Sequence, residues 1–584
     1  MVVQRKGKET TSRTKEPCAL VVALDVGTEY SGWAYSSRED FRCDPAKVCT
    51  RTWQGGAIIS LKAPTCVLLS EDGRTLEKFG YEAETAYAEL LEKNEHEKWL
   101  YFRHFKMALW NQNVTREMTI AAENGREVPA LTVFALTIRH LAEDALVTHK
   151  SRGGTAVQSD VRWVVTVPAI WSDAAKQMMR EAAEMAGLPL QNFLLALEPE
   201  AASMYARHVT RETSADARST FDVGKQYIVV DAGGGTVDIT VNETAADGSV
   251  REIHRPTGGD WGGARVNQTF FKLLEEMTGI PVKESMSKSY MLDYLELYRE
   301  FEVRKRETRA TSDTSVTIRL PQALSKLVLR EKGVSLMEVL QSSPCSDQIQ
   351  LVEDRLRLSH DVVEHLYQPS ITQIVKHLSN LTQRPEVCHA KSIVLVGGFA
   401  NSALLQETIS ATFPDYRIII PDKPDLAVLI GAVMFGHNDG WIAERISKLT
   451  YGISVHSAFD NKRHPASKRV VREDGEIRCK DVFDKYVILG QTLRVNDVQS
   501  METYNVYESN SSHMDITVYC SSEKNPVFVT DKDCKKVGKL TLPLTGSGRQ
   551  REITVSMIFG GSEITVEATE EATKNICKLK IDFL

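Results

Sequence analysis

Two different patterns of apolar and polar residues distinguish two parts of the chain. Between residues 19 and 436, β-branched apolar runs alternate with segments of helical period, which is typical of an α/β domain. "DVRWVVTVPAIW" predicts a strand that ends at Pro168, and a helix is predicted over residues 172–185, with its serine at the N-cap position and Gly187 as its stop. "LLALEPEAASMYA" predicts a strand that runs into a helix, and residues 266–377 are predicted to be rich in helices.

Beyond residue 436 the pattern changes: apolar and polar residues alternate strictly within short segments that are separated by turn residues. Such segments at regular spacing are typical of an antiparallel β-sandwich. The predicted strands are "MDITVYC", "PVFVT", "KLTLPL", "EITVSMIF", "SEITVEAT" and "KLKIDFL".

These two patterns, together with a polar break over residues 211–225, predict the domain organisation. The predicted parts are a disordered basic tail (1–18), an α/β domain (19–437) with lobe I (19–210) and lobe II (226–437), a linker (438–450) and a β-rich domain (451–584).

The stretch "YIVVDAGGGTVDITV" interrupts a β-branched run with Gly233, Gly234 and Gly235, and it places Asp231 and Asp238 on either side of them. The glycines alone fit a tight hairpin. Successive bare N–H groups also form an anion-binding nest, and carboxylates beside a phosphate require a divalent cation between them. The stretch therefore predicts a phosphate loop for a magnesium nucleotide, with the plain hairpin as the alternative.

A second stretch repeats this order of a strand, an aspartate, glycine and threonine, and another strand. "ALVVALDVGTEYSGWAY" has a strand, then Asp25, Gly27 and Thr28, then another strand. The duplication predicts two related lobes that face each other across a cleft. "SIVLVGGFANSALLQ" adds the pair Gly397-Gly398 at a strand-to-helix turn, where a ligand can approach a helix N-terminus, although a simple βα turn remains the alternative. The P-loop and dinucleotide fingerprints are absent, so ATP binding would use another architecture.

Composition narrows the functional classes. The 584-residue chain has 26% charged residues and a formal net charge of -7, which does not indicate nucleic acid or an anionic membrane as a partner. The longest apolar stretch, residues 426–435, is too short to span a bilayer, and the basic N-terminus lacks the apolar segment of a secretory signal. Ten scattered cysteines without metal-ligand spacing resemble reduced thiols, so a cytoplasmic protein is expected.

In order and spacing, these motifs resemble those of the 70-kDa heat-shock protein family, and more closely its atypical type-12 branch. The resemblance runs from about Leu20 to Gly436 and continues weakly beyond. It implies a two-lobed, actin-like ATPase fold with duplicated ribonuclease-H-type sheets, followed by an antiparallel β-sandwich domain. The stretches that carry it are "LDVGTEYS", "RWVVTVPAIW", "REAAEMAGL", "LALEPEAAS", "VVDAGGGTVDITV", "TGGDWGG", "VGGFANSALLQ" and "PDLAVLIGAVMFG".

The family's functional positions match this sequence residue by residue, and the resemblance implies ATP or ADP with Mg²⁺ as ligands. Asp25 and Asp231 match the aspartates that hold Mg²⁺ through water. The catalytic positions are matched by Lys106, Glu198, Asp231, Thr236 and Asp238. The nucleotide-binding positions are matched by Gly27, Thr28, Glu29, Tyr30, Gly233, Gly234, Gly235, Gly259, Glu302, Lys305, Arg306, Gly397, Gly398 and Asp425.

Phosphoryl transfer to water depends on positioning and on charge stabilisation. Lys106 is expected to reach the γ-phosphate, and Glu198 or Asp238 to orient the attacking water. Each assignment has an alternative. The two metal aspartates could be turn residues that bond their own backbone. Lys106 could be a solvated lysine on a helix, and "FEVRKRE" could be an exposed charged face.

Departures from the family pattern predict weaker or slower ATP handling. Glu29 stands where the family has a threonine beside the γ-phosphate. An inward carboxylate would repel phosphate, but we expect it to point outward to solvent, because the rest of the site is complete. Residues 399–401, Phe-Ala-Asn, replace a Ser-Thr-Arg whose arginine stacks on adenine, and Lys176 replaces an arginine of the lobe-to-lobe relay.

The C-terminal part also departs from the family. The junction "NDGWIAERISKLTYGISV" lacks the leucine-rich acidic linker, no helical lid is predicted after the strands, and the acidic C-terminal tetrapeptide that recruits co-chaperones is missing. The expected function is a chaperone-like, stress-response protein whose ATP or ADP state switches lobe closure and the binding of a polypeptide client or signalling partner by the β domain. Hydrolysis is expected to be slow or weak. The alternatives are a nucleotide-binding scaffold without useful hydrolysis and an actin-fold small-molecule kinase.

Overall fold

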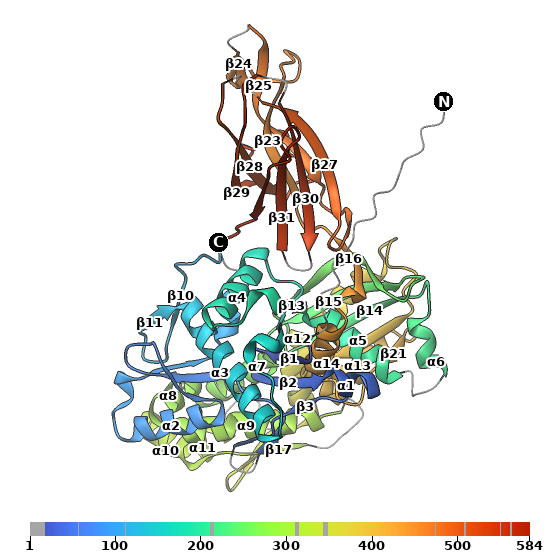
Figure 1. Ribbon diagram of the computed structural model, residues 1–584. Helices are drawn as coiled ribbons and strands as arrows, with labels where there is room; N and C mark the ends of the chain where they lie inside the picture. The colour runs from blue at the N-terminus through green and yellow to red at the C-terminus, as the bar shows by residue number, and fades with distance from the viewer. Residues whose placement is uncertain are drawn as a thin grey trace.

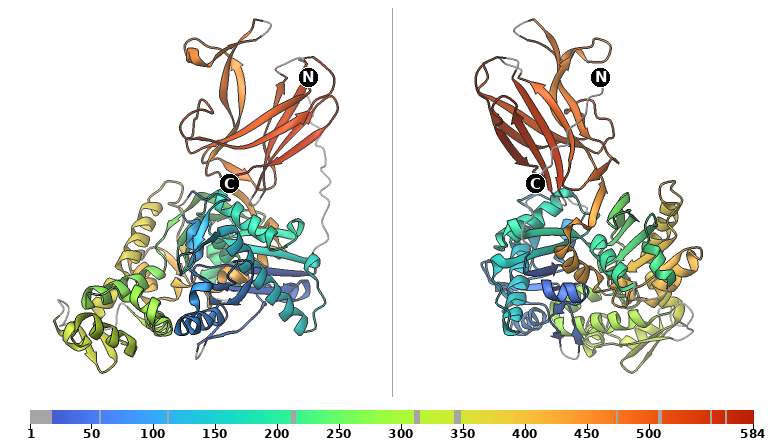
Figure 2. Two further views of the ribbon diagram at one scale, coloured as in Figure 1. Left: turned by 90° about the vertical axis from the view of Figure 1, so that its left-hand side faces the viewer. Right: turned by 45° about the vertical axis from the view of Figure 1, so that its right-hand side comes forward.

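The computed structural model describes residues 18–55, 58–110, 113–210, 215–309, 315–342, 348–472, 475–506, 510–548, 551–560 and 563–584. The basic tail predicted over residues 1–18 lies outside this part except for its last residue. Figure 1 shows an α/β body at the bottom and an all-β domain standing on it. Figure 2 shows the body divided into two lobes.

Lobe I is built on a mixed sheet of order β13-β12-β1-β2-β3, with β6 also paired to β2. β1 pairs with β12 in parallel and with β2 in antiparallel orientation. All side chains of β1 are buried, so helices cover the sheet on both faces. The strands are β1 Leu20–Asp25, β2 Tyr30–Ser37, β3 Cys49–Thr50, β6 Ala63–Pro64, β12 Val161–Val167 and β13 Phe193–Leu197.

Lobe II repeats this pairing in the strands β21-β20-β14-β15-β16 and extends it with β22 and β26. β14 pairs with β20 in parallel and with β15 in antiparallel orientation, as β1 does with β12 and β2. The duplicated hairpin of the sequence therefore corresponds to a duplicated sheet. The strands are β14 Gln226–Ala232, β15 Val237–Thr244, β16 Val250–Gly259, β20 Ser392–Val396, β21 Arg417–Ile419, β22 Ile442–Ile446 and β26 Thr492–Arg494.

Two helices, α5 (Glu198–Thr210) and α14 (Ala427–His437), pack between the two sheets in one shared core. The far face of the lobe I sheet is covered by α3 (Ala130–Ser151) and α4 (Asp173–Met185). The helix predicted over residues 172–185 is confirmed as α4, whose N-cap Ser172 accepts a hydrogen bond from Ala175 N. The predicted strand-to-helix passage is confirmed as β13 and α5.

Smaller elements complete lobe I and the passage between the lobes. They are α1 Arg38–Cys43, β4 Trp53–Gly55, β5 Ile58–Ser60, β7 Cys66–Leu69, β8 Leu76–Phe79, α2 Tyr81–Glu92, β9 Leu100–Arg103, β10 Thr119–Ala121, β11 Glu127–Pro129 and α6 Ala215–Arg218.

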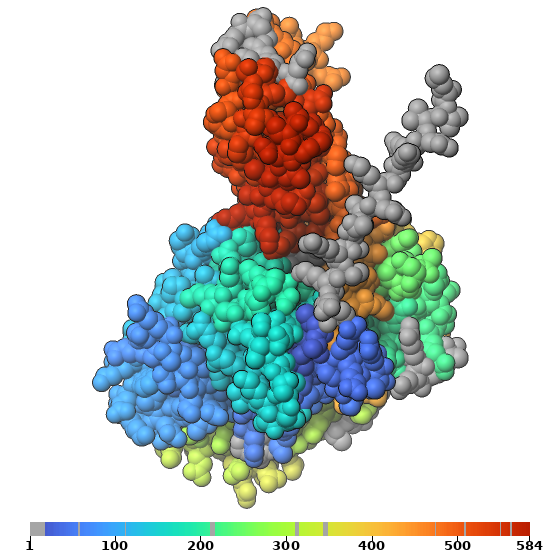
Figure 3. Space-filling view, in the orientation of Figure 1, coloured from blue at the N-terminus to red at the C-terminus, as the bar shows by residue number. Residues whose placement is uncertain are grey.

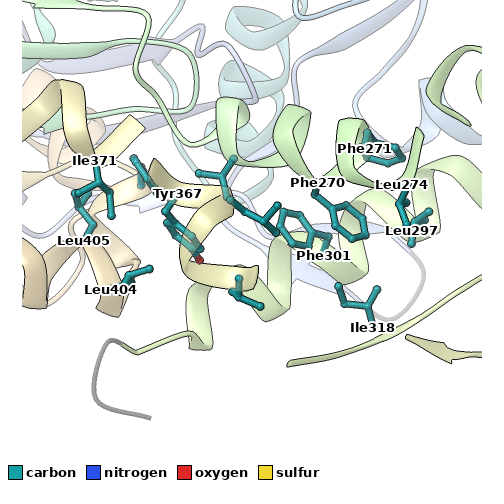
Figure 4. Close-up of a cluster of buried hydrophobic side chains, with 14 of the residues drawn as sticks. Phe270, Phe271, Leu274, Leu297, Phe301, Ile318, Tyr367, Ile371, Leu404 and Leu405 are labelled. Atoms are coloured by element: carbon teal, nitrogen blue, oxygen red, sulfur yellow. The ribbon is translucent and has the colours of Figure 1, made fainter. Parts of the chain in front are cut away.

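The middle of lobe II contains the predicted helices and also a small sheet of order β17-β19-β18, which the helical pattern did not indicate. Its strands alternate buried and exposed residues over only four positions each, too short a signal to separate from the surrounding helices. Figure 4 shows the core beneath it, where Phe270 and Phe301 stack with ring centroids 4.1 Å apart. The elements are α7 Ala264–Thr278, α8 Val282–Ser289, α9 Met291–Glu307, β17 Val316–Arg319, α10 Gln322–Lys332, α11 Leu336–Gln341, β18 Ile349–Val352, β19 Arg355–Leu358, α12 His360–Thr382 and α13 Ala403–Thr412.

The β domain consists of two antiparallel sheets around one apolar core. The prediction of a strand at "PVFVT" was wrong, because Phe528 forms only an isolated bridge to Val482. No α-helix occurs after α14 in the described residues. One sheet has β24 Arg469–Val471, β25 Ile477–Val487, β23 Thr450–Ala458, β28 His513–Ser521 and β29 Cys534–Pro543, and the other has β27 Val498–Asn505, β30 Glu552–Gly560, β31 Glu563–Glu570 and β32 Ile576–Lys580.

The junction between body and β domain is structured. Residues 438–450, which the sequence predicted as a linker, contain β22, which pairs with β16 of lobe II and with β26 from the β domain. The β30–β31 end of the β domain contacts lobe I, where Arg180 Nε lies 2.9 Å from Glu563 Oε1. Figure 3 shows the β domain standing directly on the body. None of the helices in the described ranges is both long and apolar enough to cross a bilayer.

Candidate nucleotide site

The β1–β2 and β14–β15 turns face each other between the lobes. Asp25 is the last residue of β1 and Asp231 the next to last of β14, so corresponding positions in the matching sheets supply one carboxylate each. Both line a cavity of about 240 Å³. The duplication in the sequence thus becomes a site with pseudo-symmetric walls.

The same cavity gathers the residues that the resemblance assigned. All those predicted as catalytic, metal-binding or nucleotide-binding line it, with the exception of Gly259. Gly259 ends β16, where a Cβ atom would lie 2.5 Å from the ring of Trp261. Packing of the indole thus accounts for a glycine at this position.

The glycines of the second hairpin allow close contact between the lobes. A Cβ atom on Gly234 would lie 2.5 Å from Glu29 Cγ, and one on Gly235 would lie 2.6 Å from Thr28 Oγ1. Gly397 has a φ of +92°, and a Cβ atom there would lie 2.4 Å from Asp231 Oδ1. Side chains at these positions would force the hairpins apart or block the cavity.

Asp25 already has a cationic partner within the chain. Lys62 Nζ donates to Asp25 Oδ2 over 2.7 Å and to the carbonyl oxygen of Asp425 over 2.9 Å, and Thr166 Oγ1 donates to Asp25 Oδ1 over 2.8 Å. Burial alone would raise the pKa of Asp25, but the charges of Lys62 and Lys106 outweigh it and hold the pKa below its usual value. The sequence analysis missed Lys62 and Thr166, since neither belongs to a glycine motif.

Asp231 has no such partner among the described residues. It is 4% exposed and lines the cavity. Burial and the charges of Glu198, Asp238 and Asp25 raise the pKa of Asp231 well above its usual value. A concentration of negative charge at this point favours a bound cation.

Lys106 and Glu198 form a buried ion pair across the floor of the cavity. Lys106 Nζ lies 2.7 Å from Glu198 Oε1, and its ammonium stands 5.4 Å from the centroid of the Trp171 ring. Lys106 is 4% exposed and lies in a short 3-10 helix, so the alternative of a solvated lysine on a helix face is wrong. Burial raises the pKa of Glu198 to about 7 despite Lys106.

Asp238 connects the second hairpin to lobe I. Its Oδ1 accepts a hydrogen bond from Ile170 N at 2.9 Å, and its Oδ2 accepts one from Thr236 Oγ1 at 3.1 Å. Burial raises the pKa of Asp238, although both hydrogen bonds oppose the shift. The carboxylate is therefore fixed in orientation at the contact between the lobes.

The donor set suits Mg²⁺ that is held through water and nucleotide phosphates. No three His, Cys, Asp or Glu side chains in the described residues are placed to chelate a metal directly. The uncompensated carboxylate of Asp231 and the raised pKa values around it nevertheless fit a hydrated divalent cation. Lys62 would have to release Asp25 for this aspartate to share in holding that cation.

The expected outward orientation of Glu29 is wrong. Its side chain is 12% exposed, Tyr298 donates to Oε2 over 2.7 Å, and His104 Nδ1 lies 2.8 Å from Oε1 without hydrogen-bond geometry. Burial opposes ionisation, but the charge of His104 and the hydrogen bond from Tyr298 lower the pKa of Glu29 to about 2. Glu29 thus carries a full charge beside Gly234, and the protein supplies the imidazole and the hydroxyl that lie against it.

The opposite end of the cavity is formed by α9 and by the β20–α13 region. Glu302 and Lys305 are buried there, while Arg306 is exposed at the rim. Lys305 Nζ contacts Glu302 Oε1 and also donates to Gly263 O at 3.0 Å and to Asn267 Oδ1 at 2.9 Å. The alternative of a solvated charged face is therefore wrong for Glu302 and Lys305, and it fits only Arg306.

The residues that depart from the family pattern at positions 399–401 and 176 lie in different places. Phe399 is 4% exposed and lines the cavity beside Gly398, whereas Asn401 does not line it. The apolar Phe399 ring thus lines the cavity at the position where the family pattern has a serine. Lys176 is buried near the junction, with Nζ 3.6 Å from Asp173 Oδ1.

Duplicated sheets, facing Asp-x-Gly hairpins and a buried carboxylate cluster are the features of a two-lobed nucleotide-binding protein with an actin-like ATPase fold. The Hsp70 protein family model matches residues 100–456, more than half of the chain, and the chain belongs to the Hsp70 family. Proteins of this family bind ATP or ADP with Mg²⁺.

The similarity extends along nearly the whole chain. Heat shock 70 kDa protein 12A of Homo sapiens is 35% identical over 624 aligned residues, which cover 97% of this chain and 91% of that protein. Heat shock 70 kDa protein 12B of Homo sapiens is 33% identical with the same coverage. A chaperone protein HscA homolog of Neisseria meningitidis is 24% identical over 62% of this chain and 53% of its own length. The resemblance drawn from the motifs, including the type-12 branch, is confirmed.

Proposed function

We propose that this protein binds ATP and ADP with Mg²⁺ between its lobes, and that the bound nucleotide controls lobe closure and the grip of the β domain on a polypeptide. The observation that carries the proposal is the single cavity that brings together both Asp-x-Gly hairpins, Lys106 and Glu198. Membership of the Hsp70 family supports nucleotide as the ligand.

In this proposal each polar group has one role. Asp25 and Asp231 hold the metal through its waters, and bare N–H groups of the hairpins bind the phosphates. Mg²⁺, when bound, neutralises phosphate charge. Lys106 donates to the terminal phosphate, while Glu198 and Asp238 orient the water that attacks it.

We propose that hydrolysis is slow. Glu198 is paired to Lys106, so each must leave the other, at least in part, to act on water and phosphate. Glu29 adds a fixed negative charge next to the phosphate hairpin. Both contacts oppose the approach of a γ-phosphate more than that of ADP, which ends at the β-phosphate.

A chain of contacts supports coupling from the site to the β domain. The Ile170 N–H donates to Asp238, and the carbonyl oxygens on either side of it, those of Ala169 and Trp171, accept from Lys448. Lys448 lies between β22 and β23, where the chain enters the β domain. A shift of Asp238 toward or away from lobe I would therefore move the peptide that Lys448 holds.

Other contacts fix the same junction. Arg445 binds Glu200 with two hydrogen bonds of 2.9 and 2.6 Å, and Tyr451 donates to Asp173 Oδ2 over 2.9 Å. These side chains belong to β22 and β23 on one side and to lobe I on the other. A polypeptide partner for the β domain is favoured by similarity to a chaperone protein, the HscA homolog.

A nucleotide-binding scaffold without useful hydrolysis is the second candidate. It is favoured by the two internal charges, Lys62 at the metal aspartate and Glu29 at the hairpin, which occupy groups that catalysis would need. Both candidates predict nucleotide binding, and they differ only in turnover.

Direct binding and single-turnover assays test the proposal. The full chain is expected to bind ADP and ATP in Mg²⁺, and to hydrolyse bound ATP slowly. Asp231→Asn is expected to abolish the Mg²⁺-dependent part of the affinity without unfolding the protein, because the substitution conserves shape and removes charge repulsion. Lys106→Ala is expected to slow hydrolysis on the order of a hundredfold with little effect on ADP affinity.

The outcomes separate the candidates. Binding without detectable turnover would leave the scaffold, and unchanged hydrolysis in a folded Asp231→Asn protein would remove the metal assignment. Failure of the wild-type chain to bind either nucleotide would reject both candidates.

A further inference from the structure

A second cavity, of about 620 Å³, lies on the other side of α9 from the nucleotide cavity. We call it the arginine pocket, because Arg304, Arg309, Arg319, Arg355, Arg357 and His360 line it. Glu300 and Glu307 are the carboxylates among its described lining residues. Figure 1 shows β17, one wall of the pocket, at the end of the body opposite the β domain.

Three of the arginines, Arg319, Arg355 and Arg357, come from one face of the small sheet. In β19, Leu356 and Leu358 point into the core, so Arg355 and Arg357 share the outer face. Arg319 of β17 lies directly opposite Arg355 in the antiparallel register. Like charges at opposed positions destabilise a strand pair, and the single carboxylate of Asp354, which pairs with Arg319 and also attracts Arg355, offsets this repulsion in part.

The guanidinium groups are unequally compensated. Arg319 pairs with Asp354 at 2.8 Å, and Arg304 pairs with Glu300 at 3.1 Å and with Glu307 at 3.2 Å. No carboxylate of the described residues lies within ion-pair distance of Arg355 or Arg357. Within the described part of the chain, the pocket therefore holds two guanidinium groups that have no ion-pair partner, on neighbouring outward positions of one strand.

We propose that the arginine pocket binds an acidic polypeptide segment in extended conformation. Side chains two apart on a strand stand about 6.7 Å from each other, which is also the repeat of alternate side chains in an extended peptide. A peptide with carboxylates at alternate positions would meet Arg355 and Arg357 in register, and each guanidinium can bind a carboxylate with two parallel hydrogen bonds.

The lining favours a peptide over a compact polyphosphate. Glu300 and Glu307 stand on the α9 side of the pocket and would repel a dense cluster of phosphates. A peptide can place neutral residues beside these glutamates and carboxylates beside β19. This proposal does not depend on nucleotide binding, because Arg355 and Arg357 belong to the arginine pocket alone.

The test uses the full chain and a short fluorescein-labelled peptide of alternating Glu and Ser, followed by fluorescence anisotropy. The wild type is expected to bind this peptide, to ignore the same peptide with Gln in place of Glu, and to release it at high salt. The Arg355→Gln/Arg357→Gln variant is expected to lose affinity by about tenfold, and Arg355→Glu/Arg357→Glu by more.

Lys326→Glu/Arg330→Glu is the matched control, since both residues are exposed on α10 outside the arginine pocket and the change in net charge is the same as in the reversal variant. The control is expected to bind within about twofold of the wild type. Equal losses in the pocket and control variants would show a general charge effect and overturn the proposal. Direct binding of inorganic triphosphate, measured by titration calorimetry, with no binding of the Glu–Ser peptide would assign a phosphate ligand and overturn it as well.

Discussion

The hydroxyl of Tyr298 in lobe II donates a hydrogen bond of 2.7 Å to the carboxylate of Glu29 in lobe I. Glu29 also lies 2.8 Å from His104, and its pKa of about 2 keeps it charged at neutral pH. The bond joins the lobes beside the phosphate hairpin, at a position where the family pattern has a threonine. The protein therefore places its own anion next to the hairpin that would hold the γ-phosphate.

Glu29→Thr is expected to tighten ATP binding relative to ADP. Two unit charges about 6 Å apart interact by roughly 3 kcal/mol at an effective dielectric constant near 20. His104 offsets part of this repulsion, so we expect the ATP-to-ADP affinity ratio to rise by about tenfold. Isothermal titration of the wild type and the variant with each nucleotide in Mg²⁺ measures the ratio.

Tyr298→Phe is the control for this substitution. It removes the hydrogen bond between the lobes and leaves the charge of Glu29 in place, so the affinity ratio is expected to stay close to that of the wild type. A rise in both variants would mean that the hydrogen bond between the lobes, and not the charge, limits ATP binding. No rise in either would show that the carboxylate moves away from bound ATP.

The position of Glu29 shows where sequence reasoning ends. Asp25 and Asp231 could be located from the sequence because local glycine patterns determine the turns that carry them. The orientation of Glu29 depends on His104 and Tyr298, which come from distant elements and belong to no motif. A side chain whose partners are brought in by the tertiary fold cannot be oriented by its own neighbours.

The same limit explains Lys62 and the small sheet of lobe II. Lys62 reaches Asp25 because β6 pairs with the start of β2, which brings the residue before β6 next to the β1–β2 turn. Lys62 is preceded and followed by ordinary apolar residues. The strands β17 and β19 are four residues long and pair across an intervening helical stretch. The α4 helix, by contrast, carries its own N-cap and amphipathic period, and both were visible in the sequence.

Lys62→Met is expected to make nucleotide binding more dependent on Mg²⁺. In the wild type the Lys62 ammonium compensates Asp25, so the cavity is less negative than its carboxylates alone would make it. We expect the ratio of ADP affinities in excess Mg²⁺ and in EDTA to grow by about tenfold in the variant. Titration calorimetry under the two conditions provides this ratio.

Lys62→Arg keeps the charge and is expected to behave like the wild type in the same titrations. If Lys62→Met and the wild type depend equally on Mg²⁺, the lysine serves only the packing of its segment. If Lys62→Arg follows Lys62→Met, geometry at Asp25 and not charge is the cause.

His437→Gln is expected to reduce the loss of stability in mild acid. His437 Nε2 lies 2.9 Å from Ser36 Oγ, and its ring stacks on Phe41 at 4.3 Å. Burial, with the charges of Arg162 and Arg38, lowers its pKa to about 4. Because this value lies below the ordinary one near 6.5, the unfolded chain binds the proton first, and stability falls as the pH drops from about 6.5 toward 4.

Above pH 6.5 the neutral histidine has no such effect. At pH 5.5 the wild type is expected to lose about 1 kcal/mol through this group, after allowance for its partial exposure. Thermal unfolding at pH 7.5 and 5.5 is the measurement, with His365→Gln on the exposed face of α12 as the control. Equal acid sensitivity of the wild type and His437→Gln would show that the ring accepts a proton without cost.

Lys448→Met is expected to separate the nucleotide site from the β domain. Lys448 donates to the carbonyl oxygens that flank Ile170, whose N–H donates to Asp238, so it is the last link between the cavity and β23. Without the Lys448 ammonium, a movement of residues 169–171 is no longer transmitted through these hydrogen bonds to the junction. ADP affinity should stay within about twofold, because Lys448 does not line the cavity. Hydrogen exchange of the β domain, measured with ATP and with ADP, should differ less between nucleotides than in the wild type.

Lys468→Met is the matched control, since Lys468 bonds to Asp481 and Thr530 within the β domain. The hydrogen exchange of this variant should still respond to the bound nucleotide. A full nucleotide response in Lys448→Met would mean that the signal travels by another route, with the Glu200–Arg445 pair as the next contact to examine.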